Sequence, residues 1–166
     1  MVSIVVDILL LQTVSIAIAS AGVFAAAIYY IIQIRHQTKV RQTDLVVRLY
    51  SIYGSKEFQE AWATVRDFEF KDYDDFMKKY GWSAAMSEVC LFFEGVGVLL
   101  HKKLIDISVV DDLFTGPIKM TWEKMKPIVE GHRKQKKYPQ FYEWLEYLYN
   151  EMKKREQQLQ TGVKNG

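Results

Sequence analysis

The chain has 166 residues and a formal net charge of +2, and 49% of its residues are hydrophobic and 14% aromatic. This hydrophobic content argues against a disordered chain. The weak positive charge argues against a nucleic-acid-binding protein, whose basic residues usually gather on one face. The single cysteine, Cys90, excludes an intramolecular disulfide, and its apolar neighbours Leu91 and Phe92 predict a buried thiol under reducing conditions.

The first element is an uncharged segment over residues 8–34, which Arg35, Lys39 and Arg41 follow directly. A helix of about 27 residues would measure roughly 40 Å, more than the ~30 Å hydrocarbon core of a bilayer. We therefore predict a single membrane-spanning helix over about residues 8–34, within an anchor formed by residues 1–34.

Two alternatives to a membrane span remain open for this segment. Ala19, Ser20 and Ala21 could mimic the cleavage site of a signal peptide, but no Lys or Arg precedes the apolar run, which continues past them to Ile34. A core helix of a soluble protein is seldom this long without a polar face. Both alternatives fit the segment less well than a span does.

The charges on either side of the segment predict its orientation. Asp7 precedes the span, and the three basic residues Arg35, Lys39 and Arg41 follow it and can meet anionic lipid. The positive-inside rule then places the N-terminus outside the cell and residues 35–166 in the cytoplasm. The predicted location is thus the cell membrane, with the lipid bilayer as the first partner.

Small residues recur within the span at helical spacing. Ala17, Ala21 and Ala25 are each separated by four residues, which places them on one helix face. Such a face lets two helices approach closely in lipid, although alanine is also simply tolerated in membrane helices. We therefore predict a possible homo-oligomer that packs through this face.

The first half of the remaining chain predicts helices with recognisable ends. Residues 35–53 contain no helix breaker, so the first helix should continue to Gly54. Ser55 can cap the next helix, and Asp72 can cap a short helix that stops at Gly81. Ser83 can open a strongly apolar helix that ends near Lys102, which we expect to be the central core helix because Glu88 and Glu94 interrupt it too often for a second span.

The second half contains the breakers. Ser108 with Asp111 resembles a capping box, the Gly116–Pro117 pair is expected to break or kink the helix that follows, and Gly131 to end it. Residues 132–137 read as a basic linker, and Pro139 suits the first turn of a last helix. Residues 35–156 should form an all-α cytoplasmic domain, an antiparallel bundle of four to five helices, with residues 157–166 as a frayed polar tail.

No pattern for metal or nucleophilic chemistry is present. None of the histidines His36, His101 and His132 has a second His or Cys at helical spacing, and His36 and His132 lie in basic stretches that predict solvated side chains. We accordingly predict no catalytic residue, no metal ligand and no cofactor.

Glu94 is the residue that breaks the local pattern. It lies in the apolar run from Leu91 to Leu100, beside Gly95 and Gly97, which are expected to allow close helix packing. A carboxylate there needs a partner or must lose its charge. Arg133, Arg66 or Arg48 could supply an ion pair, or an aromatic side chain such as Trp122 a hydrogen bond. A structural pair that fixes helix register is the favoured interpretation, and a functional carboxylate is the alternative.

Five short motifs carry a family resemblance, and they occur in this order: 92–97 (FFEGVG), 105–107 (IDI), 116–118 (GPI), 121–123 (TWE) and 131–133 (GHR). The sequence over about residues 30–150 resembles a family of small prokaryotic membrane-anchored helical proteins described as a domain of unknown function. The resemblance implies a membrane helix followed by a short helical domain, and that Glu94, Trp122 and Arg133 belong to one packed cluster. It implies no activity.

Three functions follow from these features. The favoured one is a membrane-anchored interaction or regulatory module with an unidentified cytoplasmic protein partner and no nucleic acid. The second is an oligomeric membrane effector that transmits a cytoplasmic rearrangement into the bilayer. The third, least supported because no catalytic constellation is present, is an enzyme that uses Glu94 as acid or base.

Overall fold

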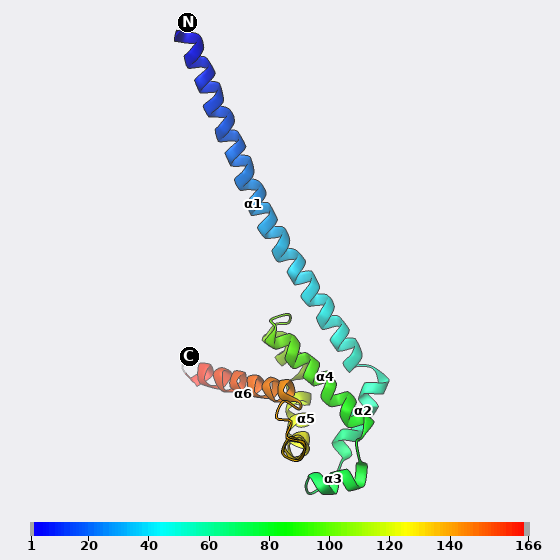
Figure 1. The fold of residues 1–166 in the computed structure, drawn as a ribbon. Coiled ribbons are helices and arrows are strands. Elements are labelled where there is room, and N and C mark those ends of the chain that lie inside the picture. The colour runs from blue at the N-terminus through cyan, green and yellow to red at the C-terminus, as the bar shows by residue number, and fades with distance from the viewer. Residues whose placement is uncertain (1, 165–166) are drawn as a thin grey trace. The chain divides into compact units, whose positions relative to one another are not determined.

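The structure of the protein is a computed structural model that describes residues 2–164 (Figure 1). The described residues form six helices and no strand, which confirms the predicted all-α fold. The chain divides into two units, residues 1–44 and 45–166. Residues 165 and 166 of the predicted tail lie outside the described part of the chain.

The first unit consists of helix α1 (Val2–Tyr53) up to residue 44. All side chains from Leu10 to Arg41 are exposed, including Phe24, which is 71% exposed. The hydroxyls of Ser15 and Ser20 donate hydrogen bonds of 2.8 Å to the carbonyl oxygens four residues earlier. These hydroxyl groups are therefore hydrogen-bonded within the helix itself.

Two helices of the described chain are long and apolar enough to cross a membrane by length and composition, α1 from Leu10 onward and α4 (Ala84–His101). None of the apolar window in α1 is buried. In α4 one whole face lies in the core of the second unit, with Met86, Val89 and Phe93 fully buried. The apolar character of α4 is thus explained by packing.

The second unit is a helical bundle in which α4 contacts both α2 (Lys56–Asp67) and α6 (Glu143–Lys164) (Figure 1). The last turns of α1 also pack on this core through Leu45, Leu49 and Tyr53. Its largest fully buried side chains come from five helices: Phe58, Phe76, Met86, Phe93, Phe114, Ile118, Met125, Ile128, Leu145, Leu148 and Met152. A single core of this size suits a domain of this length.

The predicted ends of the early helices are confirmed. The Ser55 hydroxyl accepts from the amide of Phe58, and the Asp72 carboxylate accepts from the amide of Asp75 at the start of α3 (Tyr73–Tyr80). Gly81 follows α3 with a φ of 58°, a conformation that glycine adopts without strain. Local side-chain chemistry alone sets these ends.

Helix α5 (Ile107–Lys136) differs from the sequence predictions in its length and in its cap. The Gly116–Pro117 pair does not break it, and the basic segment 132–136 is its last turn rather than a linker. A continuous buried face runs through it, and this packing outweighs the lost hydrogen bonds at Pro117 and Pro127. Its cap is the carboxylate of Asp106, which accepts from the Ser108 amide at 3.1 Å, so the expected Ser108 capping box was wrong.

Gly131 does not end α5 but allows α3 to approach it. A Cβ atom at Gly131 would meet the side chain of Tyr73, lying 2.6 Å from its Cγ. Helix α6 begins at Glu143, after a turn that contains Pro139, and continues to Lys164, beyond the end expected near residue 156. The glycine and proline signals therefore mark packing and a turn here, not helix ends.

Candidate functional site

Glu94 caps the start of a distant helix. Its Oε2 accepts a hydrogen bond of 2.7 Å from the amide of Leu145, in the first turn of α6. Tyr142, the residue before α6, is not a capping residue type and has a φ of 52°. The carboxylate from α4 therefore supplies the acceptor that the sequence next to α6 does not.

The surroundings of Glu94 act on its pKa in both directions. Burial raises the pKa, hydrogen bonds from the Leu145 and Trp144 amides lower it, Glu143 raises it and Arg133 lowers it. Burial is the largest of these effects, so the pKa is above its ordinary value. The direct partner of Glu94 is thus the positive end of a helix rather than one of the arginines considered from sequence.

Two further groups share this interior region. Cys90 is fully buried, as predicted, and burial followed by the nearby Glu94 raises the pKa of its thiol. The Tyr142 hydroxyl has its pKa raised by burial, then by Cys90 and Glu94, against a hydrogen bond with Ser87. Such a thiol stays protonated at neutral pH, which does not favour nucleophilic chemistry.

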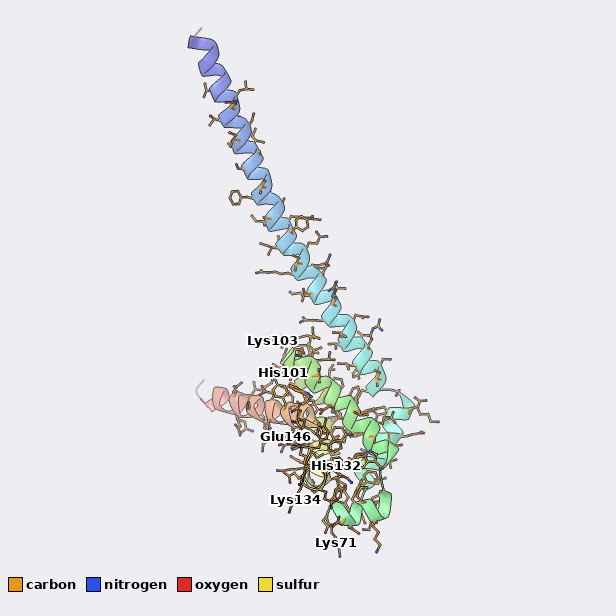
Figure 2. The ribbon with its side chains drawn as sticks, in the orientation of Figure 1. Lys71, His101, Lys103, His132, Lys134 and Glu146 are labelled. Atoms are coloured by element: carbon orange, nitrogen blue, oxygen red, sulfur yellow. The ribbon has the colours of Figure 1, made fainter. Side chains whose placement is uncertain are left out.

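Arg133 ties the end of α5 to the start of α6. Its Nη1 donates to Oε2 of Glu146 at 2.6 Å, and its Nε donates to the Phe141 carbonyl oxygen at 2.9 Å. Its guanidinium also lies 6.0 Å from the ring centroid of Trp122, which is 2% exposed. Figure 2 labels Glu146 on α6. Of the three residues suggested as one cluster, Arg133 therefore lies over the Trp122 ring and its charge lowers the pKa of Glu94.

The remaining predicted residues lie on α1. Arg35, Lys39 and Arg41 are exposed, and so are Ala17, Ala21 and Ala25. These two sets occupy the same continuous helix, one in its uncharged part and one directly after it.

The expected solvation of the histidines was wrong for His132. Its ring lies 5.0 Å from Trp82 and 4.3 Å from Phe141, measured between ring centroids, and burial followed by Lys136 lowers its pKa. The ring centroid of His101 lies 4.5 Å from that of Trp144. Within the described residues, no three His, Cys, Asp or Glu side chains gather where they could hold a metal ion.

The bundle contains a cavity of about 360 Å³, open to solvent, that the sequence did not predict. It lies between α2 and α5, and one face of each helix lines it: Trp62, Val65, Arg66, Met120, Thr121, Glu123 and Lys124. Each set has the spacing of a single helix face, but the pairing of the two faces depends on the fold. The volume falls within the range of small-molecule sites.

The cavity and the interior groups Glu94 and Cys90 differ in their surroundings. The cavity is lined by apolar side chains, two cations and the carboxylate of Glu123, whereas the carboxylate of Glu94 is held by α6 amides and the Cys90 thiol is enclosed.

A family match covers most of the chain. A family described as "Domain of unknown function (DUF4760)" matches residues 16–152. No curated protein and no solved structure matches the chain.

Proposed function

Because the chain belongs to the DUF4760 family, a domain of unknown function, we propose its role from its own residues. In this proposal the chain is a single-pass membrane protein in which α1 anchors a cytoplasmic helical domain. That domain acts as an interaction or regulatory module. The observation that carries the proposal is the uncharged segment of α1 from Leu10 to Ile34, in which every side chain is exposed.

Transfer of this surface into lipid would be strongly favourable. Leu10, Phe24, Ile28 and Ile34 are each at least 59% exposed. Exposed hydrophobic side chains also occupy the consecutive positions 28–32, which together cover the circumference of α1. Exposed apolar surface of this extent is rare on soluble proteins. The absence of any charge from residue 8 to residue 34 supports a span over the same residues.

Cysteine labelling in intact cells tests both the span and its direction. We expect Ser3→Cys to react with a membrane-impermeant maleimide in intact cells, and Lys134→Cys to react only after the membrane is permeabilised. The wild-type chain is the control, because its single thiol at Cys90 is buried and should stay unlabelled in both cases.

Three outcomes would contradict the proposal. The reversed labelling pattern would overturn the orientation, and extraction of the protein by alkaline carbonate would overturn the span. A mature protein that lacks its first residues by mass spectrometry would indicate a cleaved signal peptide.

A second candidate function is an oligomeric membrane effector. Ala17, Ala21 and Ala25 form an exposed stripe of small side chains on α1, which supports close helix contact in lipid. We expect Ala17→Ile with Ala21→Ile to abolish cross-linked dimers in membranes. The opposite-face pair Ala19→Ile with Val23→Ile should leave them unchanged, and a monomeric wild-type chain would exclude this function.

A further inference from the structure

Two of the side chains that line the cavity between α2 and α5 carry buried polar atoms without a hydrogen-bond partner among the described residues. Nε1 of Trp62 and Oγ1 of Thr121 are both buried, and neither has a hydrogen-bond partner among the described residues. Thr121 is 1% exposed, so its hydroxyl carries the desolvation cost without a compensating bond. Both residues line the cavity, so these two unpartnered donors belong to the walls that a ligand would contact.

Two cations border the same cavity. The Arg66 guanidinium lies 4.5 Å from the Trp62 ring centroid, and Nζ of Lys124 donates to the Arg66 carbonyl oxygen at 3.1 Å. Neither residue appears in an ion pair within the described part of the chain, unlike Lys119 and Lys126 on the same helix. The side-chain charges of both cations thus remain available to an anion.

The third charged residue of the lining does not neutralise both cations. Oε1 of Glu123 accepts a hydrogen bond of 3.2 Å from the Tyr149 hydroxyl, which directs part of its carboxylate toward α6. With Arg66, Lys124 and Glu123 at the lining, its formal charge is +1 (two cations and one anion). The site therefore favours an anionic group over a neutral one.

The rest of the lining is apolar. Val65 is 1% exposed at the wall contributed by α2, and Met120 contributes a flexible thioether from α5. The Trp62 ring adds a flat aromatic surface beside them. Such walls accept a compact hydrophobic body, and the polar atoms fix its orientation.

We propose that this cavity binds a small organic anion. Its aromatic or aliphatic body packs on Val65, Met120 and the Trp62 ring, and its carboxylate, sulfonate or phosphate lies near Arg66 and Lys124. The ligand is either a soluble molecule or the anionic group of a lipid. All residues that line the cavity belong to the second unit, so this inference does not depend on the proposed membrane anchor.

The test compares two probes of the same shape. The full chain in phosphatidylcholine nanodiscs is titrated by calorimetry with naphthalene-2-sulfonate and with the uncharged naphthalene-2-sulfonamide. We expect measurable binding of the sulfonate and at least ten-fold weaker binding of the sulfonamide. Equal affinity for both probes, or no binding of the sulfonate, would overturn the proposal.

Variants locate the probe. Arg66→Gln and Lys124→Gln should each weaken sulfonate binding about ten-fold, whereas Lys134→Gln, an exposed control on α5, should not. Thr121→Val should raise the melting temperature of the ligand-free protein and weaken sulfonate binding, because it removes the unpartnered hydroxyl. A lower melting temperature with unchanged binding would remove Thr121 from the site, and unchanged affinity in both charge variants would place the probe elsewhere and refute the proposal.

A lipid arm distinguishes the two sources of the anion. Nanodiscs that contain phosphatidylglycerol should raise the apparent dissociation constant of the sulfonate if the cavity takes a lipid anionic group. An unchanged constant would assign the site to a soluble anion. Either result keeps the binding site itself, which the matched probes and variants decide.

Discussion

Replacing Gly97 by alanine should destabilise the bundle by about 3 kcal/mol, the upper part of the range for overpacking a core. A Cβ atom at this position would lie 2.7 Å from the carbonyl carbon of Trp144 and closer still to its oxygen. Both contacts are with the backbone of α6, which cannot rotate away as a side chain could. The expected result is a melting temperature lower by about 10 °C, measured by circular dichroism of the full chain in detergent.

Gly95 provides the matched control. It lies on the exposed face of the same helix, and a Cβ atom there would meet nothing within 4 Å. Gly95→Ala should stabilise the protein by up to about 1 kcal/mol, because alanine has the higher helix propensity. Equal losses in both variants would show that the contact between α4 and α6 is not as close as described.

Replacing Glu94 by alanine should cost about 2 kcal/mol of unfolding free energy, since the α6 amides lose their acceptor in a half-buried place. The measurement is the melting temperature of the full chain. Glu88→Ala on the exposed face of α4 is the control and should change it little. Unchanged stability in Glu94→Ala together with lost cellular function would support the alternative of a functional carboxylate.

The pH dependence of this effect has a defined sign. The pKa of Glu94 is raised above its ordinary value of 4.5, so the folded state binds more protons than the unfolded state just above that pH. The contribution of Glu94 is therefore greatest below pH 4.5 and declines as the pH rises through the folded-state pKa. As the pH rises through the folded-state pKa, the unfolding free energy of the wild type should fall relative to that of Glu94→Gln. A relative increase would contradict the conclusion that burial raises the pKa of Glu94.

The sequence predicted best what local chemistry decides. Ser55, Asp72 and Ser83 accept from amides within their own helices, so neighbouring residues are enough to reveal each start. The apolar stripe of α4 likewise follows from its periodicity. The expected role of the glycines in close packing was right for Gly97 and wrong for Gly95.

What the sequence could not predict depends on contacts between distant segments. Pro117 and Gly131 carry strong breaker signals, but burial along α5 and the approach of Tyr73 override them. The partner of Glu94 is an amide 51 residues away. The cavity similarly forms only where α2 and α5 pack together, and no pattern within either helix predicts that contact.

The cap at Glu94 has a consequence for how the domain folds. Helix α6 starts after Tyr142 without a capping side chain of its own, and its first amides bond to a carboxylate from α4. A helix without a capping side chain of its own is stabilised mainly by packing against the rest of the domain. Helix α6 should accordingly belong to the same cooperative folding unit as α4, and its first-turn amides should exchange with solvent only when that whole unit opens.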